Sequence, residues 1–391
     1  MSDAGRPLAG LRVLDFTWAA MGPYAGYLLG GLGAEVIHVG RPDAQQSGRA
    51  TAALYQELNS GKICVRIDVK RAGGQALVRR MASKADVFLE NFRPGVVERL
   101  GLGYDDLSRD NARLVMVSAS SVGRERTEGD DVGYAPIFCA LSGVAHLTGH
   151  PDAPPVEIRH PADLTGGAVV VLAALAGLAR RRRTGTGCYV DLAAREALLW
   201  TLAPALAASQ ADPATDRRMG NAHARHVPHG VFQCAGQNRW VSIAVGSDEE
   251  WRRFCDALGR RELSDDARFA TEPDRGAHRE EVDRIVDEWA SQRSVETAAA
   301  TLQAARVAAV PSMTNRDVCE DAHIRARGVL DHVDLGDVRR WFATPPWVFA
   351  GTPRRLPETL TGAEARRHAF GTVLGLDDAT IAGLEADQVI G

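Results

Sequence analysis

Residues 11–39 read LRVLDFTWAAMGPYAGYLLGGLGAEVIHV, and this stretch decides the fold that we predict. It predicts a short buried strand at 11–15, a helix at 24–32 that stops at Gly33, and a second strand at 35–39. The glycines at 31 and 33 close a helix and precede a strand, whereas the dinucleotide-binding fingerprint follows a strand and opens a helix. We therefore interpret them as cap and turn residues inside a βαβ unit.

The alternation of strands and helices continues beyond this unit. Further strands are expected at 63–69, 85–89 and 114–119, with a helix at 73–83 between the first two. This order predicts an α/β fold in which a large, open, mainly parallel sheet of the Rossmann-like type carries helices on both faces.

The rest of the chain is expected to complete the large domain and to add a second, smaller one. The elements expected there are a long helix at 168–183, a strand at 189–192, a helix at 193–209, a polar linker at 211–229, a hairpin at 231–245, helices through 248–308, irregular Pro-rich chain after 330 and a terminal helix near 377–385. We expect residues 1–210 to form a large domain, 211–330 a smaller inserted α+β domain, and 331–391 to return to the large domain.

Composition and charge indicate which kinds of molecule the protein is not expected to bind. A net charge of −4 argues against a protein that covers a nucleic-acid backbone. The longest apolar run, at 166–179, is too short to cross a bilayer, and the N-terminus has no apolar signal-peptide core. The six scattered cysteines include no Cys-x-x-Cys pair, which is typical of free thiols in a reducing compartment. We therefore expect a cytoplasmic protein with no nucleic-acid or membrane partner.

Three clusters are candidates for chemistry from the residues alone. His223, His226 and His229 are spaced three apart, which suits either a metal site or a hydrogen-bonded polar loop, and Pro228 interrupts any helix there. The stretch 118–123 (SASSVG) follows a predicted strand, where a ligand contact and a plain turn are both open. Asp163 precedes the long helix and is expected to be its N-cap, although the same position could present a carboxylate to a ligand.

Several motifs point to one family. The most specific is Glu90-Asn91-Phe92-Arg93-Pro94-Gly95 followed by Leu100-Gly101-Leu102. Others are 11–17 with Gly22-Pro23-Tyr24, 32–37, Asn59-Ser60-Gly61-Lys62, Gly133-Tyr134-Ala135-Pro136, Gly220-Asn221, Pro228-His229-Gly230 and 371–390. Over nearly the whole chain these stretches resemble the family III CoA-transferases, the group that includes carnitine, formyl and aryl-succinate CoA-transferases and the related 2-methylacyl-CoA racemases.

The resemblance implies a set of site residues. It places the catalytic aspartate at Asp163. It places the residues that bind CoA at Ala19, Ala20, Met21, Arg41, Ile67, Lys70, Asn91, Phe92, Val96, Arg99 and Tyr134. Arg41 and Lys70 both follow predicted strand ends, where they can meet the phosphates of CoA. Acyl-CoA is then a substrate, with no permanently bound cofactor and no metal.

The resemblance also implies the reaction. CoA would move from an acyl-CoA thioester donor to a free carboxylic acid, through an aspartyl anhydride and an aspartyl-CoA thioester on Asp163. Main-chain N–H groups near Gly166 and Gly167 would hold the oxyanion, and 246–248 (GSD) would stand in for the family's glycine-rich loop. The alternative is a 2-methylacyl-CoA racemase, whose histidine position carries Tyr134 here. Members of the family form interlocked homodimers, so a homodimer is expected.

Overall fold

The computed structural model describes residues 5–42, 56–124, 133–335, 338–352, 354 and 356–391. Contacts divide the chain into two compact units. The large unit takes residues 1–145, 157–215 and 323–391, and the second unit takes 146–156 and 216–322. The chain therefore crosses between the units after residues 145, 156, 215 and 322, and the third crossing falls within the stretch 211–229 that the sequence marks as a linker.

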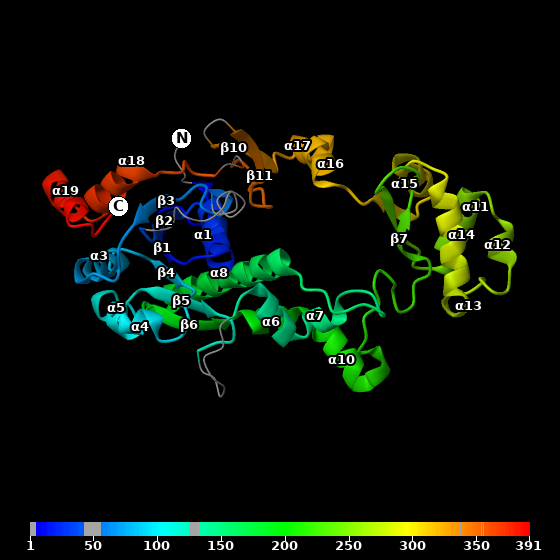
Figure 1. Cartoon of the computed structure of the whole chain (residues 1–391), viewed down its shortest axis with the longest axis horizontal. Helices are drawn as coiled ribbons and strands as arrows, with labels where there is room; N and C mark the ends of the chain where they lie inside the picture. Colours follow the sequence, from blue (N-terminus) through cyan, green and yellow to red (C-terminus); the bar gives the residue numbers. More distant parts are fainter. Residues whose placement is uncertain (1–4, 43–55, 125–132, 336–337, 353, 355) are drawn as a thin grey trace. The chain divides into compact units, whose positions relative to one another are not determined.

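A six-stranded sheet forms the centre of the large unit (Figure 1). Its strands are β1 (Arg12–Phe16), β2 (Glu35–Gly40), β3 (Ile63–Arg66), β4 (Val87–Glu90), β5 (Val115–Ser120) and β6 (Cys188–Ala193). They lie in the order β3-β2-β1-β4-β5-β6, and every neighbouring pair is parallel. The predicted α/β fold with a Rossmann-like parallel sheet is confirmed. Because the order reverses direction between β1 and β4, the crevice outside their carboxyl ends is where such sheets bind ligands.

Helices on one face of the sheet pack around valines and leucines of β1, β4 and β5. They are α1 (Met21–Gly31), α6 (Ala135–Ser142), α7 (Val144–Leu147), α8 (Arg159–Thr184) and α9 (Ala194–Thr201); α10 (Ala203–Ala211) follows α9 and has no buried residue. By length and composition alone, α8 could cross a membrane. It instead packs Val170, Ala174 and Leu178 into this core, as a buried helix of a folded domain does.

The opposite face of the sheet is covered by helices from both ends of the chain. These are α3 (Ala72–Ala82), α4 (Val96–Arg99), α5 (Tyr104–Asp110), α18 (Gly362–Arg366), the π-helix η4 (Arg367–Val373) and α19 (Asp378–Ala386). The returning chain also forms β-bridges along β3, at Ile63 with Leu360 and at Ile67 with Ile390. Figure 1 shows α18 and α19, in orange and red, on the side of the unit where β3 and α3 lie.

Three predicted elements differ from the structure. The long helix α8 begins at Arg159, nine residues before the predicted start. The helix predicted at 193–209 is two helices, because Pro204 removes a backbone donor and starts α10 anew. The chain after 330 is not irregular at first: β10 (Leu330–Leu335) and β11 (Val338–Ala343) form an antiparallel hairpin, and the prolines that suggested irregular chain lie just beyond it.

The second unit is a small α+β fold. Strands β7 (His229–Gln233), β8 (Trp240–Ala244) and β9 (Ala308–Pro311) form an antiparallel sheet, of which β9 was not predicted. Trp251, Phe254 and Phe269 lie in its core. The helices of this unit are α11 (Asp248–Leu258), α12 (Glu262–Asp265), α13 (Glu272–Ala277), α14 (Arg279–Ser291), α15 (Val295–Ala304) and α16 (Asn315–Glu320). The 3-10 helix η3 (Pro213–Thr215) belongs to the large unit, and α17 (Ala322–Ala326) lies at the boundary after residue 322.

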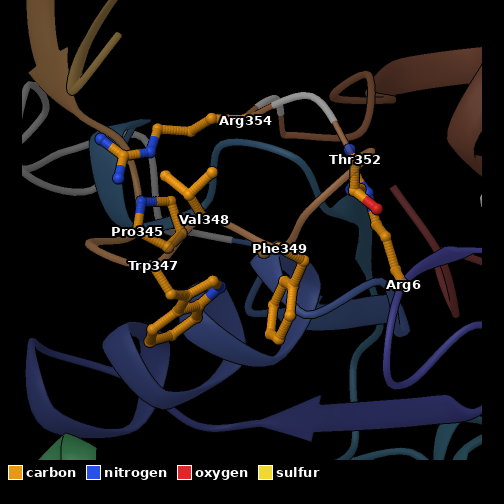
Figure 2. A pocket seen from close by; sticks show the side chains of 8 residues that line it. Arg6, Pro345, Trp347, Val348, Phe349, Thr352 and Arg354 are labelled. Carbon is orange, nitrogen blue, oxygen red and sulfur yellow. The ribbon is translucent and has the colours of Figure 1, made fainter. Parts of the chain in front are cut away.

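A strap at residues 345–352 crosses the C-terminal end of α1 (Figure 2). Pro345 lies so close to Gly31 that a Cβ there would fall 2.3 Å from the proline ring. The helix ends at Gly31 and Gly33 has φ +98°, so the cap-and-turn interpretation of these glycines is confirmed. Around the contact, side chains that include Arg6 and Trp347 enclose a pocket of only ≈ 20 Å³, about one water molecule. It lies at the end of α1 remote from the carboxyl edge of the sheet.

Candidate active site

The sequence-predicted CoA residues gather at one edge of the large sheet. They follow the four adjacent strands β3, β2, β1 and β4, and parallel strands place their carboxyl ends together. The residues concerned are Ile67 and Lys70 after β3, Arg41 after β2, Ala19, Ala20 and Met21 after β1, and Asn91, Phe92, Val96 and Arg99 after β4. The edge therefore carries cations beside an aromatic ring, which suits an anionic ligand with an aromatic part.

The individual positions differ in what they offer a ligand. Lys70 and Arg99 are exposed at the edge. The Ile67 side chain is 2% exposed and belongs to the core, so only its backbone reaches the edge. Phe92 is half-buried, with its ring centroid 5.0 Å from that of Phe16. Gly95 begins α4 with φ +81°, a left-handed conformation that favours glycine and turns the chain toward Val96.

Asn91 holds the turn after β1. Its Oδ1 accepts the Trp18 N–H at 2.9 Å, and its Nδ2 donates to the Trp18 carbonyl at 2.8 Å. The next residue, Ala19, has φ +63°, which costs energy for a side chain other than glycine. The two hydrogen bonds join the ends of β1 and β4 across the point where the strand order reverses. They leave the Trp18 indole 48% exposed at that point.

The N-terminus of α1 follows β1 and therefore lies at the same edge of the sheet. Its N-cap is Ala20, whose side chain cannot accept a hydrogen bond, and no side chain caps the helix. The backbone N–H groups of Met21 and Gly22 therefore have no intrahelical acceptor and point out of the helix end. Together with the helix dipole, they favour negative charge at this place.

Asp163 is not the N-cap of α8, as the sequence suggested. The helix begins at Arg159 after Ile158, so Asp163 lies in the second turn. The missed signal is Pro161, which is favourable in the first turn of a helix because it needs no backbone donor there. The carboxylate of Asp163 is thus not used to close a helix end.

Two glycines bring this part of α8 against α1. A Cβ on Gly166 would fall 2.6 Å from Met21 Sδ, and one on Gly167 would fall 2.6 Å from the Met21 carbonyl oxygen. They lie three and four residues after Asp163, on the same helix face. Asp163 is therefore on the side of α8 that meets the start of α1. Because both glycines are inside the helix, their N–H groups are used in it, and the oxyanion role predicted for them is wrong.

The surroundings of Asp163 disfavour its charge. Burial raises the pKa of Asp163 to about 6, and the charge of His160 one turn earlier only partly opposes this shift. No hydrogen bond to its carboxylate is found among the residues that the structure describes. A desolvated carboxylate without a partner is more reactive than a solvated one, and a pKa so perturbed is typical of functional sites.

Gly167→Ala should push α8 away from α1, because the obstructing atom is a backbone oxygen that cannot rotate aside. We expect a loss of about 1–3 kcal/mol in the free energy of unfolding, measured in urea, with a fall in catalytic rate. Gly383→Ala is the matched control. It lies inside α19 with nothing within 4 Å of its added Cβ, and should gain about 0.5–1 kcal/mol. Equal unfolding of Gly167→Ala and the unmodified protein would contradict the role given to this contact.

Other positions singled out from the sequence have surroundings that differ from those of Asp163. Tyr134 is 56% exposed at the start of α6. Ser118 and Ser120 are buried at the end of β5, and the Ser121 carbonyl accepts the Arg195 N–H at 2.9 Å. In the second unit, the 246–248 stretch that stood in for a flexible loop is a helix cap: Ser247 Oγ accepts the Glu250 N–H at the start of α11.

The histidine cluster of the second unit is a hydrogen-bonded loop. The rings of His223 and His226 stack with centroids 4.2 Å apart. His226 Nδ1 pairs with Glu272 at 2.7 Å, and His229 Nδ1 lies 2.8 Å from the Asn221 carbonyl. His223 Nδ1 accepts the His226 N–H at 3.1 Å. Within the described ranges, no group of three or more His, Cys, Asp or Glu side chains is arranged to hold a metal ion.

Two buried charged groups were not assigned roles from the sequence. Under α1, Lys62 Nζ donates to Asp15 Oδ2 at 2.7 Å and to the Pro23 carbonyl at 2.8 Å, with both charged side chains fully buried. At the carboxyl edge, Arg124 pairs with Glu90 and with Glu98. Lys62 ends the quoted Asn-x-Gly-Lys stretch, and Glu90 begins the Glu-Asn-Phe-Arg-Pro-Gly stretch. The motifs therefore marked these two residues, but they did not show that Lys62 pairs with Asp15 and Glu90 with Arg124.

Several proteins with known names have sequences similar to this one. The family model for CoA-transferase family III matches residues 8–360. Succinyl-CoA–D-citramalate CoA-transferase of Chloroflexus aurantiacus is 32% identical over 98% of this chain and 98% of its own length. Succinate–glutarate CoA-transferase of Agrobacterium fabrum is 33% identical over 86% of each chain. A probable CoA-transferase of Mycobacterium tuberculosis is 34% identical over 83% of this chain, which spans 42% of that relative's length.

Solved structures agree with the sequence comparison. A CaiB/BaiF family protein from Brucella suis superposes with a TM-score of 0.85 at 30% identity, over 95% of this chain and 100% of that one. A second structure, from Mycobacterium tuberculosis, gives a TM-score of 0.80 at 26% identity over 93% and 99%. The family model spans most of the chain, and full-length relatives exceed 30% identity. This chain therefore belongs to the family III CoA-transferases.

Proposed function

We propose that this protein moves CoA from an acyl-CoA thioester to a free carboxylic acid, with Asp163 as the nucleophile. The observation that carries the proposal is the position of the Asp163 carboxylate. It is half-buried on the face of α8 that meets the start of α1, beside the crevice where the CoA residues gather. At pH 7 it is mostly ionised and needs no base to activate it, since its pKa is about 6.

The reaction proceeds through two kinds of covalent intermediate. An Asp163 oxygen attacks the donor carbonyl carbon, the C–S bond breaks, and CoA leaves as a thiolate while a mixed anhydride forms. The thiolate then attacks the Asp163 carbonyl carbon, which releases the donor acid as a carboxylate and forms an enzyme–CoA thioester. The acceptor carboxylate repeats both steps in reverse order, and the second one restores the Asp163 carboxylate. No net proton is taken up or released.

The crevice supplies positioning and charge for these steps. The uncapped N–H groups of Met21 and Gly22 at the start of α1 are the donors we assign to the oxyanion, in place of Gly166 and Gly167. Lys70, Arg99 and Arg41 face the phosphates of CoA, and Phe92 covers its apolar part. Positioning alone can lower such a barrier by roughly 7–11 kcal/mol, which offsets the weakness of a carboxylate as a nucleophile.

We propose short dicarboxylic acids as the substrates. The relatives in Chloroflexus aurantiacus and Agrobacterium fabrum are named for succinyl-CoA with D-citramalate and for succinate with glutarate. The six free cysteines support a cytoplasmic location. A homodimer, implied by the family resemblance, is supported by large apolar side chains left exposed on α6, α8, α9 and α10, namely Ile137, Leu141, Leu172, Trp200 and Leu206.

A transfer assay tests the proposed activity. With succinyl-CoA as donor and glutarate, malate or citramalate as acceptor, we expect the acceptor's CoA thioester to form in step with free succinate, as measured by liquid chromatography. The same reaction run in D₂O should leave the α-carbon of recovered acyl-CoA unlabelled. Deuterium at that carbon without transfer would instead favour the racemase, which must remove and return the α-proton.

A further inference from the structure

Arg124 lies just past β5 in a ring of carboxylates. Its side chain is only 12% exposed, and its guanidinium pairs with Glu90 and with Glu98. Its backbone N–H donates to Asp191 Oδ2 at 2.8 Å, within β6. One residue therefore joins the chain after β5 to β4, β6 and α4.

The two glutamates stand at the two ends of the segment that is expected to bind CoA. Glu90 is 1% exposed, ends β4, and accepts the Phe92 N–H at 2.9 Å. Glu98 lies on α4 between Val96 and Arg99. The planar guanidinium of arginine can bind two carboxylates at once. The ammonium group of lysine, at the end of a flexible side chain, does not hold its hydrogen-bond donors in a fixed geometry. Arg124 thus ties the beginning of the 90–99 segment to its end.

We propose that Arg124 is a positioning residue for CoA: through Glu90 and Glu98 it fixes the 90–99 segment in the shape that binds the ligand. This inference rests on the proposed function, because it assumes that the segment contacts CoA. Arg124 itself is enclosed by protein carboxylates, so it acts on CoA through Asn91, Phe92, Val96 and Arg99 and not by direct contact.

Glu98→Gln separates positioning from charge. The Glu98 side chain is 49% exposed and the Glu90–Arg124 pair is kept, so the variant should fold. Removing a negative charge beside the site should by itself strengthen the binding of an anionic ligand. If Arg124 positions the segment through Glu98, the dissociation constant of CoA rises instead, by about two- to fivefold, the range of a single partly exposed ion pair. The kcat should change by less than about twofold, because bound substrate still meets Asp163 unchanged.

Arg124→Lys is the second variant. The substitution keeps the positive charge but loses the planar guanidinium that binds both glutamates. We therefore expect the dissociation constant of CoA to rise in this variant as well. Asp110→Asn is the control: it breaks the exposed pair with Arg79 at the far end of α5, away from the carboxyl edge, and should not alter CoA binding.

The experiment is calorimetric titration of each variant with CoA, with kcat and KM for succinyl-CoA and urea unfolding measured on the same samples. A raised dissociation constant in Glu98→Gln and Arg124→Lys, with an unchanged one in Asp110→Asn, supports the inference. Unchanged or tighter binding by Glu98→Gln, while the unmodified protein binds CoA, overturns the inference and leaves the proposed function intact. If the unmodified protein does not bind CoA, the proposed function fails and the inference fails with it.

Discussion

Asp163→Asn should lower the rate of CoA transfer by at least about a thousandfold while CoA still binds. An amide carries no negative charge to attack a thioester, and no other carboxylate is placed on the face of α8 that meets Met21. Asp105→Asn, on the exposed side of α5, is the matched control and should keep full activity. Borohydride added during turnover should reduce the acylated aspartate, which mass spectrometry would locate on the peptide that contains residue 163. Turnover retained by Asp163→Asn would remove this side chain from the mechanism.

The same substitution should make the protein more stable at neutral and alkaline pH. The folded state raises the pKa of Asp163 from 3.8 to about 6, so it binds the proton more tightly than the unfolded chain does. Stability from this group is therefore fully present below pH ~4 and is lost as pH rises through about 6. Two pKa units correspond to about 3 kcal/mol, and solvent screening of a half-buried group reduces this to about 1–2 kcal/mol. Urea unfolding at pH 8 and pH 4 should show a gain in the variant only at the higher pH.

Lys62→Met should cost about 3–5 kcal/mol of the free energy of unfolding, the largest stability loss expected for a single substitution here. Lys62 and Asp15 are both fully buried, and Nζ also contacts the Asn59 side chain at 3.1 Å. Burial alone would raise the pKa of Asp15, but Lys62 and then His38 outweigh it and lower that pKa well below its usual range. Removing Lys62 leaves a buried carboxylate without its main counter-charge.

Two further variants make this prediction specific. Lys84→Met removes an exposed lysine and should change stability by less than about 0.5 kcal/mol. Adding Asp15→Asn to Lys62→Met removes the uncompensated charge and should recover part of the lost free energy of unfolding. A double-mutant cycle of urea unfolding measures this coupling between the two residues. Equal losses for the single and the double variant would show that packing of the lysine chain, and not its charge, stabilises this part of the core.

The parallel sheet and its carboxyl edge could be predicted because they depend on periodicity, whereas the order of the strands was not predicted. Apolar runs alternate with helical patterns through residue 120, and short connections leave few topologies open. Arg41 and Lys70 follow predicted strand ends, which places them at that edge, whereas Asn91 was assigned to the site only by the resemblance to the family. The strand boundaries moved by only a few residues, as for β3, which ends at Arg66 and not at 69.

Features set by distant contacts could not be predicted. The start of helix α8 at Arg159 is a different case, because its local signal, Pro161, is present in the sequence and was missed when Asp163 was expected to be the N-cap. Gly166 and Gly167 suggested free backbone donors, whereas their role is to let α8 approach Met21, a residue about 145 positions earlier. The pairing of Arg124 with Glu90 likewise spans 34 positions, and no periodicity marks a pair so far apart in the sequence.

The return of the chain to β3 has a consequence for how the protein is made. The layer that covers one side of the sheet is completed by Ala369, Phe370 and Ile390, all almost fully buried, which a ribosome delivers long after the strands they shield. During synthesis the nascent large unit must wait, with that side covered only by α3, α4 and α5, while the whole second unit emerges and can fold first. A chain that ends before residue 360 would keep the six strands but would lose the C-terminal helices that complete the cover of this side of the sheet. Such a chain would expose apolar residues and would be bound by chaperones or degraded by proteases.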